Sequence, residues 1–235
     1  MAADHLAEPR EAAPIPRGPK RLVPAARQQQ ILEGAIAYFA EFGFDGSTRT
    51  LATHLGISQA LLFRYFPNKA ALIDRVYEVM FLNRWNPRWH GLLTDRAQPL
   101  GARLKAFYQD YNRSIDRYEV IRISLFSALR NETISQRYVA RIRAQLIAPI
   151  AEECRAHLGL APSSELPVTH LEEQLVLGLH ATVIYGIMRK HVFHAAAPTD
   201  TDFLIELYVD GFMHHAGVAF RRVLARAQAL AAPAG

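Results

Sequence analysis

The stretch from Ser47 to Lys69 constrains the fold of this 235-residue chain more than any other segment. Ser47 has a hydroxyl that can cap the start of a short helix, and Gly56 can end that helix because glycine takes the left-handed conformation without steric penalty. Ser58 can cap a second short helix, which Pro67 ends because the residue before a proline avoids the α region. Two short helices joined by a glycine turn predict a helix-turn-helix motif at about residues 47–66.

The second helix of such a motif enters the DNA major groove, and its outward side chains reach the base edges. The outward side chains expected here are Gln59, Ala60, Leu61, Arg64 and Tyr65. Glutamine can pair with adenine through two hydrogen bonds, and small or apolar side chains can contact the methyl group of thymine. A glycine between two short helices also occurs in helical hairpins that bind no DNA, so the spacing alone leaves that alternative open.

The residues around this motif resemble the DNA-binding domain of the TetR family of transcriptional regulators. The resemblance covers about residues 30–73, roughly a quarter of the chain. It is carried by Ile31-Leu32-x-x-Ala35, Phe39-x-x-x-Gly43-Phe44, Ser47-Thr48, Leu51-Ala52, Leu55-Gly56-Ile57-Ser58, Leu62-Phe63-Arg64-Tyr65-Phe66, Asn68-Lys69 and Leu72. It implies an all-α fold, with an N-terminal three-helix DNA-binding domain followed by a larger helical domain for ligand binding and dimerisation.

The resemblance also implies which side chains contact DNA. Thr48 and Arg49 fall where the family contacts the DNA backbone and sometimes a base, and Tyr65 and Lys69 fall on phosphate-contacting positions. Phe63 is a departure, because the family usually has a tyrosine there whose hydroxyl binds a phosphate. The predicted DNA-binding residues are Thr48, Arg49, Ser58, Gln59, Ala60, Leu61, Arg64, Tyr65 and Lys69.

Composition narrows the class of protein further. Half of the residues are apolar, which is enough for a substantial core. The single cysteine, Cys154, excludes an internal disulfide or a cysteine zinc site; we expect a buried thiol and a cytoplasmic protein. Between residues 17 and 69 there are seven basic and three acidic side chains, so most of the net charge of +5 lies in the predicted DNA-binding part. No nucleophile–base pair, carboxylate pair or metal cluster stands out, so we expect no catalytic site, no cofactor and no enzyme activity.

Three segments are expected along the chain. Residues 1–24 are rich in proline and alanine and are predicted to be a disordered basic tail without a secretory signal; the basic stretch 17–21 is either a minor-groove arm or a solvated tail. Residues 25–84 form the predicted DNA-binding domain, and residues 85–230 the effector-binding and dimerisation domain. Helices are expected at 25–43, 69–85, 99–116, 118–129, 132–158, 166–193 and 200–229.

The helix from Lys69 is the element that, by the resemblance, links the two domains, so a tilt of it would change the distance between two recognition helices. The apolar run 175–188 has 14 residues and is too short to span a membrane, so we expect a buried helix and no membrane partner. His191 and His194 have a spacing that can hold a metal, but no carboxylate or cysteine is clearly placed with them. We therefore expect core, interface or surface histidines and no metal site.

Two further sets of residues are predicted in the C-terminal part. A largely apolar cavity for a small apolar or aromatic effector is expected to involve Trp85, Trp89, Phe107, Tyr111, Phe126, His180 and Tyr185. A helix face of small residues and the final helix are expected to form a two-fold four-helix bundle with a second subunit through Gly178, Thr182, Gly186, Leu204, Tyr208, Gly211 and His215. The same residues also describe ordinary packing within one chain.

Together these features predict a homodimeric, sequence-specific DNA-binding transcriptional regulator. The expected partners are double-stranded operator DNA and a small-molecule effector, and a repressor that the effector releases from a pseudo-palindromic operator is the favoured mechanism. The alternative is a ligand-free, non-specific or architectural DNA-binding protein, for which binding would be independent of sequence.

Overall fold

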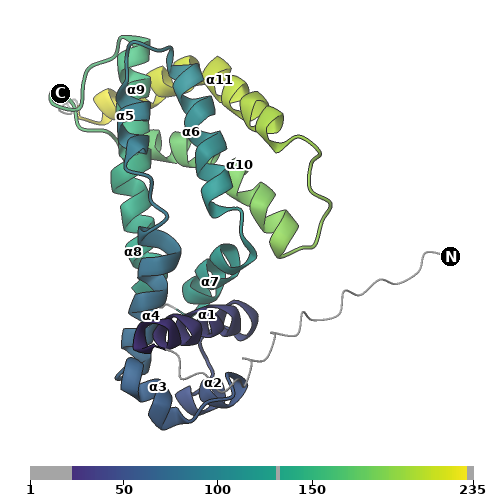
Figure 1. The fold of residues 1–235 in the computed structure, drawn as a ribbon. Helices are drawn as coiled ribbons and strands as arrows, with labels where there is room; N and C mark the ends of the chain where they lie inside the picture. Colours follow the sequence, from purple (N-terminus) through teal and green to yellow (C-terminus); the bar gives the residue numbers. More distant parts are fainter. Residues whose placement is uncertain (1–22, 131–132, 232–235) are drawn as a thin grey trace. The chain divides into compact units, whose positions relative to one another are not determined.

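The computed structural model describes residues 23–130 and 133–231, and every regular element in these residues is helical (Figure 1). The predicted tail, residues 1–24, lies almost entirely outside the described residues. The chain divides into two compact units at Val79/Met80, whereas the sequence placed the domain boundary after residue 84.

The first unit holds α1 (Pro24–Phe42), α2 (Thr48–His54), α3 (Gln59–Tyr65) and α4 (Lys69–Tyr77). Its core is built from the apolar stripe of α1 and the inner faces of the three short helices. The core side chains include Ile31, Leu32, Ala35, Phe39, Leu51, Leu62, Leu72 and Val76. This packing holds α2 and α3 against α1 and leaves their outer faces in solvent.

The second unit continues from a π-helical turn, η1 (Glu78–Leu82), which follows α4 directly. Its further elements are α5 (Arg88–Thr94), α6 (Leu100–Ile115), α7 (Tyr118–Leu129), α8 (Thr133–Ile142), η2 (Arg143–Ile147), α9 (Ala148–Leu158), α10 (His170–His191) and α11 (Thr201–Ala231). α11 packs against both α10 and α6, while α5 packs against α6 and α9 (Figure 1). Leu104, Phe107, Leu146, Val176 and Val209 are among its fully buried side chains.

Two helix predictions need correction. The helix expected at 69–85 ends at Leu82, and its last turn is π-helical. The sequence assigned no helix to residues 88–94, where α5 forms. Pro87 was interpreted only as the end of a helix, but proline is also tolerated at a helix start, where its missing N–H costs nothing. Asn86 Oδ1 accepts a hydrogen bond from the backbone N–H of Arg88 at 3.0 Å and so stabilises that start.

The stretch predicted as one helix at 132–158 is helical from Thr133 to Leu158 with a π turn, η2, in its middle. Pro149 is the second residue of α9, and Ala148 alone separates it from η2. A proline inside a helix removes one backbone donor and clashes with the carbonyl four residues earlier. The wider π turn ahead of Pro149 accommodates that clash, so the helix continues without a break. α8 and α9 therefore form one long column in Figure 1.

The remaining predicted helices agree with the structure to within a few residues, and Cys154 is buried as expected. Burial raises the pKa of its thiol to about 12, so the cysteine stays protonated and inert. Within residues 23–130 and 133–231, no helix is both long enough and apolar enough to cross a membrane.

Candidate nucleic-acid interface and effector region

Local capping builds the helix-turn-helix. Ser47 Oγ accepts a hydrogen bond from the N–H of Thr50 at the start of α2, and Ser58 Oγ accepts one from the N–H of Leu61 at the start of α3, each at 3.1 Å. Asn68 caps α4 in the same way, with 2.8 Å from Oδ1 to the N–H of Ala71. The three helix starts predicted from these residues are therefore confirmed.

The turn between α2 and α3 depends on Gly56, whose φ of +64° lies in the left-handed region. The N–H of Gly56 donates to the carbonyl of Thr53, and the N–H of Ile57 donates to the carbonyl of Ala52, both at 3.0 Å. This pair of bonds is the Schellman motif, which satisfies the last carbonyls of α2. A side chain at position 56 would be strained, so glycine sets the angle at which α3 leaves α2.

The predicted DNA-binding side chains gather on the outer surface of α2, α3 and the start of α4. Arg49, Ser58, Ala60 and Arg64 are exposed. The half-buried members of the set are Thr48, Gln59, Leu61, Tyr65 and Lys69. Apolar Leu62 lies between them in sequence but points into the core, so the outer surface of α3 is separated from its buried face.

A hydrogen bond joins the two helices of the motif on this outer surface. Gln59 Nε2 donates to Thr48 Oγ1 at 2.9 Å, which connects the first residue of α3 to the first residue of α2. The amide oxygen of Gln59 accepts no hydrogen bond from residues 23–130 or 133–231, so it is available as an acceptor for a base edge. Sequence reasoning assigned both residues to DNA but did not find the bond, because its partners are 11 residues apart.

Two other positions on this surface, Lys69 and Phe63, differ from a simple phosphate contact. Lys69 Nζ donates to the carbonyl of Phe44, so this half-buried ammonium group also stabilises the loop before α2. Phe63, the departure from the family pattern, is 39% exposed on the outer side of α3. An exposed aromatic ring there offers apolar contact but no hydroxyl for a phosphate.

In the second unit, four of the predicted effector residues form one aromatic cluster. The ring of Trp89 lies 5.8 Å from Phe107 and 5.2 Å from Tyr111, centroid to centroid. His180 on α10 lies 5.3 Å from Tyr111, which closes the group from the other side. The cluster continues to Trp85, whose ring is 5.1 Å from Trp89. Trp89, Phe107, Tyr111 and His180 are all buried.

Two polar groups inside this cluster have no hydrogen-bond partner among the described residues, namely His180 Nδ1 and Tyr108 Oη. Their rings are 6.1 Å apart. Burial lowers the pKa of His180 from 6.5 to about 4, so the imidazole is neutral at physiological pH, and burial raises the pKa of Tyr108. Neutral, unsatisfied donors and acceptors in an aromatic setting are suited to an uncharged polar group of a bound molecule.

The other two predicted effector residues lie elsewhere. Phe126 is half-buried on α7, with the guanidinium carbon of Arg122 5.3 Å from its ring centroid. Tyr185 is 55% exposed on α10 and contacts Phe193, not the aromatic cluster. The helical spacing that brought Tyr185 into the set with His180 does not distinguish the inner face of α10 from the outer one.

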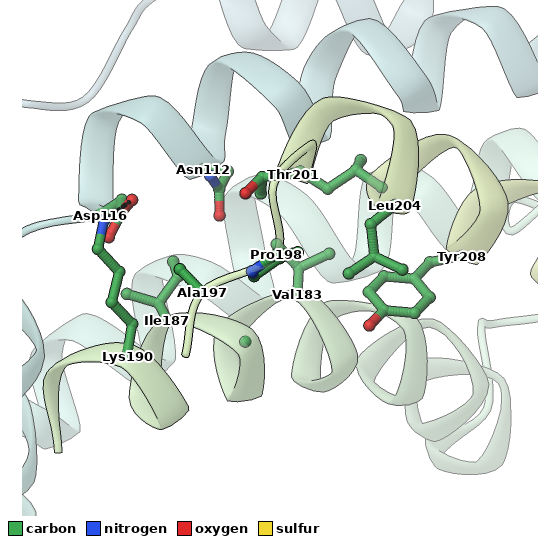
Figure 2. A pocket seen from close by; sticks show the side chains of 12 residues that line it. Asn112, Asp116, Val183, Ile187, Lys190, Ala197, Pro198, Thr201, Leu204 and Tyr208 are labelled. Carbon is green, nitrogen blue, oxygen red and sulfur yellow. Dashed lines mark hydrogen bonds and ion pairs between the residues drawn. The ribbon is translucent and has the colours of Figure 1, made fainter. Parts of the chain in front are cut away.

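The predicted dimer residues separate into two groups. Gly178, Thr182 and Gly186 are exposed along one face of α10, and Gly211 and His215 are exposed on α11. Leu204 and Tyr208 line a pocket between α10, α11 and the end of α6 in the same chain (Figure 2), and Gly186 lines it as well. The exposed apolar side chains beside the first group are Leu171, Leu177, Tyr185, Phe203, Leu207 and Val218. In the sequence, these apolar positions could have been found from their spacing of three, four or seven residues along each helix.

The pocket in Figure 2 encloses about 460 Å³, including space open to solvent, and Pro198 and Ala197 lie across it. Asp116 at its edge accepts from Lys190 Nζ and contacts His191 Nε2, each at 2.7 Å. Burial would raise the pKa of Asp116, but these two bonds outweigh burial and lower it. His191, half of the pair with metal-ligand spacing, is thus engaged with a carboxylate on another helix.

Sequence reasoning did not find the ion pairs that hold this unit together. Arg155 and Glu172 are both fully buried and joined by two hydrogen bonds of 2.6 and 2.7 Å. Glu153 accepts from Arg103 and from Arg96 at 2.9 Å. The partners come from different helices, so no local pattern identifies them.

Comparisons with known proteins agree with this geometry. Residues 31–76 match the family model described as bacterial regulatory proteins, tetR family. A 49-residue stretch is 47% identical to the HTH-type transcriptional repressor Rv1474c of Mycobacterium tuberculosis (strain ATCC 25618 / H37Rv); it is 20% of this chain and 26% of that protein. The chain therefore spans about a quarter of the length of this curated relative.

Solved structures resemble a much larger part of the chain. A TetR-like transcriptional regulator from Rhodococcus sp. RHA1 has a TM-score of 0.58 at 18% identity, over 80% of this chain and 96% of that one. AmtR of Mycobacterium smegmatis has a TM-score of 0.55 at 23% identity, over 86% of this chain and 90% of that one. At these identities the likeness concerns the fold.

An N-terminal helix-turn-helix unit followed by a larger all-helical unit is the arrangement that this chain shares with the solved TetR-family structures. Within this arrangement, residues 31–76 match the TetR-family model, and the fold of the larger part of the chain resembles that of solved TetR-family structures. The family model and the similar proteins are described as transcriptional regulators.

Proposed function

We propose that this protein is a homodimeric transcriptional repressor that acts in the cytoplasm and binds a pseudo-palindromic operator. The observation that carries the proposal is the outer surface of α2 and α3, where Arg49, Gln59, Ala60 and Arg64 stand on a scaffold built by three helix caps and a glycine turn. Such a surface offers hydrogen-bond donors and acceptors for base edges together with positive charge for phosphates.

The dimer is supported by the exposed apolar side chains of α10 and α11. Monomeric proteins rarely leave a contiguous set of large apolar side chains in water. Small residues at Gly178, Thr182 and Gly186 would let two helices approach closely. A two-fold axis would supply two recognition helices for half-sites about one DNA turn, ~34–36 Å, apart.

The effector is proposed to be a small, largely apolar or aromatic molecule bound at the aromatic cluster of the second unit. Its binding would tilt the helix that starts at Lys69 and move two recognition helices out of register with the operator. Effector and operator must then weaken each other's binding by the same factor. Equal operator affinity with and without every ligand that binds would contradict this step.

Selection of DNA from a random pool, at about 150 mM salt, tests the function. A two-fold symmetric motif is expected. A folded dimer that enriches no sequence would instead support the second candidate, a non-specific architectural DNA-binding protein.

A further inference from the structure

The threonines of α2 differ in what their hydroxyl groups bind. Thr50 Oγ1 lies 2.9 Å from the hydroxyl of the N-cap serine, and Thr53 Oγ1 donates to a carbonyl one turn earlier at 3.0 Å. Both of these hydroxyls are therefore engaged within α2 and its cap. The hydroxyl of Thr48 instead accepts a hydrogen bond from Gln59 Nε2 on α3. Thr48 is thus the threonine of α2 that connects the two helices of the motif.

Both ends of this bond are held in place. Thr48 is the first residue of α2, directly after the cap at Ser47, and its β-branched side chain has few rotamers. Gln59 is the first residue of α3, directly after the cap at Ser58. A free glutamine side chain loses rotamer entropy when it binds a partner, and one that is already held at its tip loses less. The bond therefore orients the amide of Gln59 before DNA arrives.

The bond also determines which end of the amide is left for a base. Nε2 carries the donors of the amide, and it directs one of them at Thr48 Oγ1 at 2.9 Å. No hydrogen bond within the described chain reaches Oε1 of Gln59, so its lone pairs are available. In the major groove, adenine N6 and cytosine N4 are donors, whereas guanine and thymine present acceptors and no donor. An amide fixed in this way is suited to the amino group of a base.

We propose that Thr48 is a positioning residue for Gln59, and that Gln59 Oε1 accepts a hydrogen bond from the amino group of adenine or cytosine. This inference rests on the proposed function, since it names the base-reading chemistry of the same surface. A hydroxyl oxygen that accepts a hydrogen bond can still donate its own proton. The contact with the DNA backbone expected for Thr48 is therefore compatible with its positioning role.

Base analogues test which end of the amide reads the DNA. The full-length protein would first select its operator from a random pool, and Gln59→Ala would identify the base pair that depends on Gln59. At that pair, purine in place of adenine, or 2-pyrimidinone in place of cytosine, removes the amino group. A 7-deazapurine in the same pair removes the N7 acceptor instead. We expect loss of the amino group to weaken binding about five-fold or more, and loss of N7 to have a smaller effect.

The same analogues with Gln59→Ala provide the control for altered base pairing. A missing amino group also weakens the base pair itself, and that effect is common to both proteins. The ratio of affinities for natural and analogue DNA should therefore be large for the original protein and close to one for Gln59→Ala. Because each ratio compares one protein with itself, a change in its folded fraction cancels.

Gln59→Glu provides a second test, because a carboxylate accepts hydrogen bonds and donates none. The Thr48 hydroxyl can donate to one carboxylate oxygen and leave the other for the base. We expect lower affinity overall, since the added charge is repelled by phosphates, but an undiminished penalty for the missing amino group. A donor role of the amide nitrogen predicts the opposite, namely loss of that penalty.

Variants of Thr48 separate positioning from direct contact. Thr48→Val removes the hydroxyl at nearly constant shape and should reduce the penalty for the missing amino group about three-fold, whereas Thr48→Ser should restore it. In the Gln59→Ala background, Thr48→Val should leave the ratio unchanged, because a backbone contact acts on natural and analogue DNA alike. Thr53→Val is the matched control, since it removes a hydroxyl of α2 that does not bind Gln59.

Four results would overturn the inference: no base pair that depends on Gln59, a larger effect of N7 than of the amino group, a Gln59→Glu protein that is insensitive to the amino group, or Thr48→Val weakening natural and analogue DNA equally. Failure of the proposed function would appear earlier and separately, as a selection that enriches no sequence. An enriched operator that Gln59 reads through N7 would contradict this inference and leave the proposed regulator intact.

Discussion

Two side chains of this protein combine a structural hydrogen bond with a proposed role in DNA recognition. Gln59 and Lys69 were assigned to DNA from the sequence, and each also makes a hydrogen bond that organises the helix-turn-helix. A substitution at either position therefore changes two properties at once. The experiments must separate loss of a DNA contact from loss of local structure.

Gln59→Ala should relax the preference at one base pair by about 1–3 kcal/mol, because its amide oxygen and nitrogen are suited to reading one base. It should also destabilise the domain by about 1 kcal/mol through loss of the bond to Thr48. Binding to operators mutated at each position would measure the preference. Urea unfolding of the variant without DNA would measure the structural part of the change separately. An equal loss on all sequences would refute base reading.

Lys69→Ala should weaken binding to every sequence and reduce the slope of log K against log salt by about one, as expected for one phosphate contact. The change also removes the donor to the carbonyl of Phe44, which weakens the loop before α2. Lys69→Gln keeps a donor without the charge. If neither variant changes the salt slope, Lys69 is a structural residue and not a phosphate contact.

His180 makes the stability of the protein sensitive to pH. Its pKa is about 4 when folded and 6.5 ordinarily, so stability is present above pH 6.5 and is lost as the pH falls toward 4. The shift corresponds to about 3 kcal/mol. His180→Phe should remove this loss and, since Nδ1 has no partner in the described chain, cost little at neutral pH. Urea unfolding between pH 4 and 7 would measure it, and an unchanged pH slope would contradict the assignment.

At the scale of the helices, ion pairs in the second unit join side chains that lie far apart in the sequence. On α6, Lys105 and Arg113 pair with Asp210 and Asp202 of α11, at 2.7 and 2.8 Å. The start of α10 is held by Thr169 and Glu172, which cap each other, and by Arg155. The exposed pairs between α6 and α11 are solvated and contribute little, whereas the buried pair on α10 has no access to water.

Glu172→Gln should destabilise the protein by about 3–5 kcal/mol, because it leaves the buried guanidinium of Arg155 without its counter-charge. Burial would raise the pKa of Glu172, but hydrogen bonds from Arg155 and Thr169 outweigh burial and lower it below 4.5. Its contribution is therefore complete above pH 4.5 and is lost as the pH falls through the folded value.

Urea unfolding at about pH 7 and at acid pH would check both effects, and the variant should lose part of the acid sensitivity. Glu165→Gln, an exposed change in the loop before α10, is the control and should have an effect within about 0.5 kcal/mol. A similarly small effect of Glu172→Gln would show that the pair is not a stabilising contact.

At the scale of the whole molecule, the proposed function depends on assembly into a dimer. The exposed apolar side chains of α10 and α11 have no covering partner in the described part of the chain, and two recognition helices are needed for a symmetric operator. The dimer was predicted from small residues on α10. Large exposed side chains such as Tyr185, Phe203 and Leu207 now extend that surface.

Leu207→Glu should weaken dimerisation at least ten-fold, because a carboxylate would be buried in an apolar interface. Operator affinity should fall with it. Sedimentation at several protein concentrations would measure the dissociation constant of the dimer. Val139→Glu places the same charge on an exposed apolar position of α8 and should leave the dimer intact. A Leu207→Glu protein that remains dimeric would exclude this face as the interface.

The sequence by itself determined the helix-turn-helix and most helix boundaries. The helix starts and the turn depend on hydrogen bonds to backbone groups a few residues away, made at Ser47, Gly56, Ser58 and Asn68. Their effect is local, so it can be predicted from the sequence. The all-α class and the family followed from the same local signals. The start of α5 after Pro87 was missed because proline both ends and begins helices.

Only the tertiary structure decided which faces meet. It turned Leu204 and Tyr208 toward α10 of the same chain, left Tyr185 in solvent, and joined Arg155 to Glu172. It also placed the guanidinium group of Arg141, from α8, over the ring of Trp85, 4.6 Å from the ring centroid. These contacts join residues far apart along the chain, and helical periodicity predicts that a face is buried without specifying what it is buried against.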